Sequence, residues 1–245
     1  INRPPLPESG AREILQATRA FNAMQARIRQ HIAQRTHMLA AITHDLQTPL
    51  TRLRLRLEKV GDEDLRHKLI EDLSNMQMMI REGLDLARSM DSNEALTALD
   101  LDSLVDSVCT DAVDAGQNVQ FEGRPGVIVN ARPQALRRCL TNLIDNAVKY
   151  GHFAKVSFVM TAQAGKNWVQ ILVRDGGPGI APDLLEKVFE PFYRIETSRS
   201  RESGGTGLGL TIAQNIAQQN GGNLQLKNLP EGGLEACLSL PVQLS

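Results

Sequence analysis

The spacing of apolar residues changes once along the chain, near residue 98, and this change limits the fold more than any other feature. Before it, apolar residues recur at steps of three and four, which places Ile14, Phe21 and Ile28 on one side of a helix. After it, short alternating runs typical of strands are interleaved with helical patterns. With 245 residues, of which 42% are hydrophobic, the chain has room for two units. We therefore predict an α+β protein in which a helical part precedes an α/β sandwich.

The helical part is predicted to be a hairpin of two long helices. The first continues through a four-residue step after Ile28 and through residues 40–57, where leucine alternates with arginine as in a strand. The leucines also fit helical spacing without a break, so continuity favours a helix. Gly61 and Asp62 interrupt the pattern, and a second helix follows with Leu69, Leu73, Met76, Ile80, Leu84 and Ala87 on one face. A single hairpin leaves its apolar stripe in water, so we expect two copies to pair into a dimeric four-helix bundle.

The second part is predicted to be a sandwich of helices on a sheet. Helices are expected over 101–115 and 132–150. Strands are expected at 118–123, 126–131, 155–163, 168–175, 223–229 and 234–240, with a hairpin turn at 164–167.

Charge, cysteine content and hydropathy limit the binding partners and the cellular compartment that we expect. Residues 1–60 carry ten Lys and Arg against four Asp and Glu, which could suit an anionic surface but is more typical of a solvated helix face. We predict no nucleic-acid partner. The three cysteines are far apart and indicate a reducing, cytoplasmic setting. No apolar run is long enough to span a bilayer, and the chain begins with Ile1, so we expect a fragment of a longer protein.

One segment of the second part, residues 140–151, combines amides with a cation. Asn142 and Asn146 lie four apart on a helical face, followed by Lys149 and Tyr150. Amide oxygens can ligate Mg²⁺ without adding charge beside a polyphosphate, and a lysine can neutralise phosphate oxygens. The alternative is a pair of surface or capping asparagines.

A second segment places Asp175 at the end of an apolar strand, followed by Gly177 and Gly179. A buried carboxylate can accept a hydrogen bond from an exocyclic amine such as that of adenine, although the same residues also suit a simple β-turn. A third segment, 189–196, carries Phe189 and Phe192, which we interpret as a packing anchor.

A glycine cluster that runs directly into an amphipathic helix forms the fourth segment. Such a backbone presents free N–H groups and a positive dipole end to an anion, which predicts a phosphate site. It is neither a Walker A loop nor a GxGxxG fingerprint. The preceding residues, with Arg194, Arg199 and Arg201, suggest a basic lid over phosphates. The candidate residues of the loop are Gly205, Thr206, Gly207, Leu208 and Gly209.

These four segments, in this order, closely resemble the N, G1, F and G2 boxes of the histidine-kinase catalytic and ATP-binding domain, whose fold is shared with gyrase, MutL and a heat-shock chaperone. The resemblance implies ATP and Mg²⁺ as cofactors. By it, Asn146 holds Mg²⁺, Asp175 binds the adenine, Lys149 meets phosphate and Tyr150 flanks the base.

The stretch HDLQTPLTRLR resembles the H box of the same family, which implies that His44 accepts the γ-phosphoryl group of ATP. A neutral imidazole has a lone pair available near pH 7, and Asp45 can orient the ring and take up its proton. Pro49 is expected to bend the helix. Thr48 lies on nearly the same face as His44, one turn later. In the resembling family a threonine here positions the water that dephosphorylates a regulator, while the alternative is a structural role at the proline.

Residues 3–28 resemble the end of a HAMP linker. The resemblance as a whole implies three parts: residues 1–34 as the end of HAMP, 35–97 as the dimerisation and phosphotransfer hairpin, and 98–245 as the ATP-binding domain. It implies a cytoplasmic fragment of a bacterial inner-membrane sensor, a homodimer that meets the membrane only through a missing N-terminal part and passes phosphate to a response regulator receiver domain. The alternatives are an ATPase of the same fold that uses water as acceptor, and a catalytically silent nucleotide-binding scaffold.

Overall fold

A computed structural model describes residues 5–9, 11–90, 94–163, 165–195 and 205–242. The chain divides into two compact units, residues 1–91 and 92–245. Among the described residues, no helix is sufficiently long and apolar to cross a membrane.

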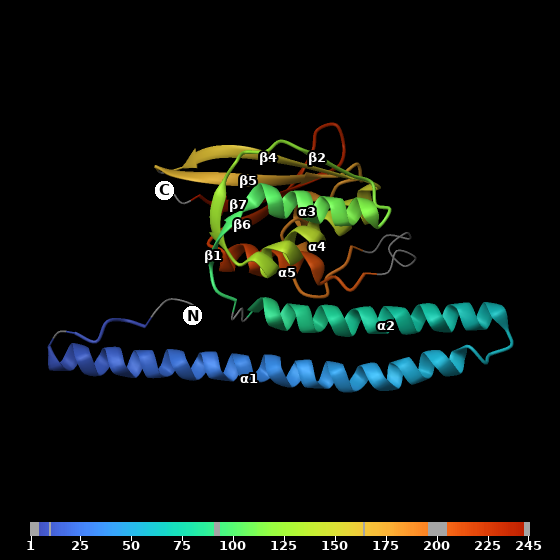
Figure 1. The fold of residues 1–245 in the computed structure, drawn as a ribbon, viewed down its shortest axis with the longest axis horizontal. Helices are drawn as coiled ribbons and strands as arrows, with labels where there is room; N and C mark the ends of the chain where they lie inside the picture. The colour runs from blue at the N-terminus through green and yellow to red at the C-terminus, as the bar shows by residue number, and fades with distance from the viewer. Residues whose placement is uncertain (1–4, 10, 91–93, 164, 196–204, 243–245) are drawn as a thin grey trace. The chain divides into compact units, whose positions relative to one another are not determined.

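The first unit is a hairpin of two helices, α1 (Arg12–Leu57) and α2 (Glu63–Met90), which confirms that part of the prediction (Figure 1). Between them, the carboxylate of Asp62 accepts a hydrogen bond from the backbone N–H of Leu65 and caps the start of α2. Leu50 of α1 and Leu73 of α2 are buried apolar residues of this unit. Pro49 lies inside α1, which continues as one helix on both sides of it.

The segment before α1 is attached to it by side-chain contacts. The Asn22 side chain donates to the carbonyl of Leu6 at 3.0 Å and accepts from the Leu6 N–H at 2.9 Å. One side-chain amide therefore satisfies both backbone polar groups of Leu6. Glu8 forms an ion pair with Arg19 at 3.0 Å. Residues 5–9 therefore run beside the first turns of α1.

The second unit is a two-layer sandwich. Its helices are α3 (Leu101–Asp114), α4 (Pro133–Gly151) and α5 (Gly209–Gln219), and two short 3₁₀ helices, η1 (Pro182–Leu184) and η2 (Lys187–Phe189), precede α5. Five strands form the main sheet in the order β2-β4-β5-β7-β6. They are β2 (Val119–Glu122), β4 (Ala154–Gln163), β5 (Lys166–Arg174), β6 (Asn223–Asn228) and β7 (Leu234–Pro241). Every expected strand is present, and β2 is parallel to β4 while the other pairs are antiparallel.

The three helices cover one face of this sheet (Figure 1). Alternate residues of neighbouring strands meet on that face, as in the cross-strand pairs Val169–Leu240 and Ile171–Leu238, all fully buried. The helices contribute the other half of the core, with Leu136, Leu140, Leu143, Ile144, Ile212 and Ile216. The period-two pattern of the strands and the three/four pattern of the helices thus produce one apolar layer.

A separate two-stranded sheet was not expected from the sequence. Strand β1 (Thr97–Asp100) pairs antiparallel with β3 (Ile128–Ala131), so the residues just before α3 belong to the sandwich. The four residues of β1, TALD, are too few to show an alternating apolar pattern in the sequence, and three of them are exposed in the structure.

Candidate nucleotide site

The amide-bearing segment occupies the last turns of α4. This helix forms because Pro133 starts it and because its apolar residues share one face. Asn142 and Asn146 lie beside that face, half-buried, and the Asn142 Nδ2 is buried with no hydrogen-bond partner among the described residues. A buried amide donor without a partner costs free energy unless a ligand or water satisfies it. The Lys149 ammonium lies 5.4 Å from the centre of the Tyr150 ring.

Asp175 follows β5 and is 9% exposed. Its Oδ1 accepts hydrogen bonds from the N–H groups of Gly177 at 2.8 Å and Leu234 at 3.1 Å. No hydrogen bond to Oδ2 is found within the described part of the chain. One carboxylate oxygen therefore fixes the loop, and the other remains available to accept from a ligand.

Close backbone approach joins Asp175 to the end of α4. A Cβ on Gly177 would lie 2.9 Å from the Tyr150 carbonyl oxygen, and a Cβ on Gly151 would lie 2.6 Å from Asp175 Oδ1. Glycine is therefore required at both positions for α4 and the loop to touch. Gly151 was not singled out from the sequence, although it directly follows Tyr150.

Gly179 belongs to a second part of the same loop. It has a φ of +74°, and a Cβ there would lie 2.6 Å from Asn228 Oδ1. The Asn228 amide holds the loop, because it accepts from the Ile180 N–H at 2.8 Å and donates to the Ile180 carbonyl at 2.6 Å. No local sequence signal pointed to Asn228, which is 48 residues away from its partner.

The glycine-rich loop meets α4. A Cβ on Gly205 would lie 2.7 Å from Lys149 Nζ and 3.1 Å from the Tyr150 hydroxyl. A Cβ on Gly209, the first residue of α5, would lie 3.5 Å from Asn146 Nδ2 and 3.9 Å from Asn142 Cγ. The start of α5 and the amides of α4 therefore face the same small space.

Within the loop, two residues between the glycines are buried. Thr206 Oγ1 accepts from the N–H of Leu208 at 3.3 Å, and Leu208 is fully buried as the residue preceding α5. Gly207 has a φ of +76° and approaches the backbone of Tyr193. These contacts hold the loop in the conformation that leads directly into the first turn of α5.

The phenylalanine segment contacts the glycine-rich loop and α5 through its backbone. The Phe192 N–H donates to the Gly207 carbonyl at 3.1 Å, and Thr211 Oγ1 donates to the Phe189 carbonyl at 2.8 Å. The Phe192 side chain is 68% exposed with a φ of +65°, so the prediction that it anchors the core is wrong. Val188, which directly precedes this segment, is buried.

The expected basic lid is described only at its start. Arg194 is exposed, while Arg199 and Arg201 lie outside the described residues.

The other site residues predicted from the sequence lie in the first unit. His44, Asp45 and Thr48 all belong to α1, and Asp45 and Thr48 are exposed. A spacing of four residues puts Thr48 one helical turn after His44.

The packing beneath the nucleotide residues is apolar. The Cys139 Sγ on α4 contacts the Ala213 carbonyl of α5 at 3.6 Å, and burial raises the pKa of this thiol to about 12. A charged group is therefore disfavoured at this point between the two helices.

The sequence of this chain is similar to known protein families and to known proteins. Residues 131–244 match the family described as histidine kinase-, DNA gyrase B-, and HSP90-like ATPase, and residues 2–30 match the HAMP domain. The sensor histidine kinase GtrS of Pseudomonas aeruginosa is 39% identical over 236 residues, which cover 96% of this chain and 48% of the relative. The sensor histidine kinase CpxA of Escherichia coli K12 is 32% identical across 99% of this chain and 54% of the relative. The chain spans about half the length of these relatives. The chain is thus similar to sensor histidine kinases along almost its whole length.

A crystal structure of full-length ShkA in complex with AMPPNP shares the fold. Its TM-score is 0.59 at 24% identity, and the match covers 85% of this chain and 46% of that one.

Proposed function

We propose that this chain binds ATP, transfers its γ-phosphoryl group to His44, and passes that group to an aspartate of a response regulator receiver domain. The observation that carries the proposal is the meeting of three distant segments. The amides of α4, the carboxylate of Asp175 and the glycine loop at the start of α5 converge around one site. The relatives, which are named sensor histidine kinases, support the same reaction.

Each side of the nucleotide has a group suited to it. Asp175 Oδ2 accepts from the adenine amine, and Tyr150 lies beside the base. Lys149 and the backbone N–H groups at the start of α5 bind phosphate oxygens, where the positive end of the helix dipole favours the anion. The loop residues that surround the nucleotide are Gly177, Gly179, Gly205, Thr206, Gly207, Leu208 and Gly209.

A Mg²⁺ ion fits the same site. Asn146 presents an amide to the space opposite Gly209. The buried Asn142 Nδ2, which no described residue satisfies, is a donor and suits a phosphate oxygen or a water molecule beside the ion. Among the described residues no cluster of three His, Cys, Asp or Glu could hold a metal ion by itself, which suits an ion bound mainly by phosphate and water. Asn146 would hold it, and when bound it would neutralise charge on the phosphates.

The chemical step needs little beyond placement. A ring nitrogen of neutral His44 donates its lone pair to the γ-phosphorus as the bond from that phosphorus to the bridging oxygen breaks, and ADP leaves with the electron pair. Asp45 accepts the proton from the other ring nitrogen, which stabilises the developing imidazolium. In this scheme Lys149 stabilises charge that grows on the leaving phosphate.

We assign the removal of phosphate from the regulator to Thr48. Its exposed hydroxyl, one turn after His44, positions a water molecule that attacks the aspartyl-phosphate of a docked regulator. The chain would then act as a phosphatase as well as a kinase, which lets the signal be reset.

The proposed function divides the chain into three parts, of which the first two lie almost entirely in the helical unit. We assign residues 1–34 to the end of HAMP, 35–97 to the dimerisation and phosphotransfer hairpin, and 98–245 to the ATP-binding domain. The HAMP match over residues 2–30 and the separation near residue 91 support this division. The same match supports a place on the cytoplasmic side of a bacterial inner membrane.

The test is incubation with γ-labelled ATP and MgCl₂. We expect the wild-type chain to become labelled and His44→Gln to take up no label while binding nucleotide normally. His67→Gln, which changes a histidine of α2, is the matched control and should label like the wild type. Labelling of the His44→Gln variant would show that another residue is the acceptor.

A further inference from the structure

The two helices that carry the nucleotide residues are also joined at their opposite ends. The last turns of α4 face the first turn of α5 around the nucleotide site. At the other end, Arg132 precedes α4 and contacts the residues that finish α5. The helices are therefore antiparallel, and a shift at one end changes their separation at the other.

Arg132 makes this far-end connection from a buried position, with 8% exposure. Its N–H donates to Asn220 Oδ1 at 2.8 Å, and its Nη1 donates to the Gln219 carbonyl at 2.5 Å. A guanidinium at the carbonyl end of α5 is favoured by the helix dipole, and a buried charge that lost these acceptors would be costly. The contact is thus strong and directional.

Glu94 brings the entry segment of the second unit into the same cluster. Its two carboxylate oxygens accept from the N–H groups of Gln134 at 2.7 Å and Ala135 at 3.0 Å, which caps the start of α4. Its carbonyl accepts from Arg132 Nε at 2.8 Å. Glu94 is only four residues beyond Met90, where α2 ends, so it is the first described residue after the hairpin.

We propose that Glu94 and Arg132 are positioning residues that couple the entry segment to the nucleotide site through α4 and α5, a role that rests on the proposed function. The nucleotide stabilises one spacing of the two helices, and the clamp formed by Glu94 and Arg132 stabilises the same spacing from the far end. Linkage then requires that loss of the clamp weakens nucleotide binding and that bound nucleotide tightens the clamp.

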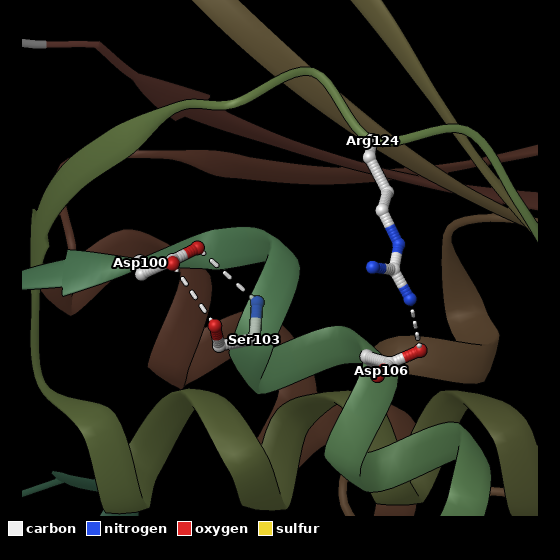
Figure 2. A network of polar contacts seen from close by, with 4 residues as sticks. All are labelled: Asp100, Ser103, Asp106 and Arg124. Carbon is white, nitrogen blue, oxygen red and sulfur yellow. Dashed lines mark hydrogen bonds and ion pairs between the residues drawn. The ribbon is translucent and has the colours of Figure 1, made fainter.

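Helix α3 offers a matched control. Figure 2 shows Asp100 at its start, where the carboxylate accepts from the Ser103 N–H at 3.2 Å and from its hydroxyl at 2.9 Å. Farther along the helix, Asp106 forms an ion pair with Arg124. None of the candidate nucleotide residues lies on α3. Asp100→Ala therefore removes a carboxylate helix cap, as Glu94→Ala does, without touching α4 or α5.

The experiment compares Glu94→Ala, Arg132→Lys and Asp100→Ala in the 245-residue chain. Thermal unfolding measures the loss of each contact, and calorimetry with AMPPNP and MgCl₂, at a temperature where all variants are folded, measures nucleotide affinity. We expect all three to lower the unfolding midpoint. Only Glu94→Ala and Arg132→Lys should weaken AMPPNP binding, by about fivefold or more. In the wild type, AMPPNP should also slow amide exchange at Gln134 and Ala135.

Two outcomes separate this inference from the function on which it rests. If the wild type binds AMPPNP and both clamp variants bind it as tightly as Asp100→Ala does, the clamp is only structural and the inference is wrong. If the wild type itself does not bind AMPPNP, the proposed function fails. Glu94→Asp keeps the carboxylate on a shorter side chain, so partial recovery of affinity relative to Glu94→Ala would support coupling.

Discussion

Asp175 shows how one residue can serve both the fold and the ligand. The sequence predicted its role from a carboxylate at the end of an apolar strand followed by glycines. The structure separates its two oxygens, because Oδ1 is bound to the N–H groups of Gly177 and Leu234. The contact with Leu234 could not be predicted, since that residue is 59 positions away and meets Asp175 only when β7 pairs with β5.

Because the two carboxylate oxygens of Asp175 have different roles, the effect of Asp175→Asn can be predicted. The amide keeps an oxygen for the two backbone donors, so the midpoint of thermal unfolding should change little. It places a donor where the adenine amine also donates, which should cost about 1–3 kcal/mol, or roughly five- to 150-fold in nucleotide affinity. Calorimetry with AMPPNP measures this, and Asp183→Asn, at an exposed position, is the control. Unchanged affinity in the Asp175 variant would exclude an adenine contact.

Thr48 is a second prediction at this scale. We expect Thr48→Ala to keep most autophosphorylation of His44 and to lose most dephosphorylation of a phosphorylated regulator, because only the second reaction needs a positioned water. The decay of labelled regulator with added protein and ADP measures it. Thr51→Ala is the control, since the Thr51 hydroxyl is used within α1 to bind the Gln47 carbonyl. Equal decay rates for the Thr48 variant and the wild type would leave Thr48 a structural residue.

At the scale of elements, periodicity was sufficient for the long helices and for every strand of the main sheet. It failed at β1, whose four residues become a strand only because β3 lies beside them. It also could not find the cluster of Glu94, Arg132 and Asn220, whose contacts join residues 38 to 88 positions apart. Local pattern reports which face of an element is apolar, whereas these contacts depend on how finished elements pack.

The junction of α4 and α5 carries a prediction of its own. A Cβ on Gly209 would meet its neighbours at 3.5 Å or more, so the fold does not require glycine there. Gly209→Ala should therefore fold with at least wild-type stability, since alanine favours a helix. It should lose most labelling by ATP, because the methyl group occupies the space between the amides and the phosphates.

Gly83→Ala is the control for this substitution. Gly83 lies in α2, and a Cβ added there would meet no atom of the described residues within 4 Å, so the same change should leave labelling intact. If Gly209→Ala labels at the wild-type rate, phosphate does not approach the start of α5 as closely as we propose.

At the scale of the whole molecule, the hairpin retains an exposed apolar stripe after its two helices have packed. On α1 it includes Phe21, Met24 and Leu46, and on α2 it includes Leu65 and Met76. Exposed apolar surface of this extent on paired helices is typical of an interface. The expected dimer would bury it in a four-helix bundle.

A charge in this stripe tests the dimer. Met76 is 50% exposed and lies three residues after buried Leu73, on nearly the same face of α2. Met76→Glu should shift the chain towards monomer at micromolar concentration, because it places a carboxylate in the proposed interface. Met78→Glu, on the opposite face, is the control. Light scattering over a dilution series measures the mass, and an unchanged dimer in the Met76 variant would contradict this interface.

The central claim is that the nucleotide site delivers phosphate to a histidine. The most direct measurement is the chemical stability of the label after incubation of the wild-type chain with γ-labelled ATP and MgCl₂. A phosphorus–nitrogen bond to His44 predicts label that survives base and is lost in acid. Release of labelled inorganic phosphate without protein-bound label would instead show an ATPase that uses water, and label stable in acid would place the phosphoryl group on a hydroxyl; either result would contradict the account.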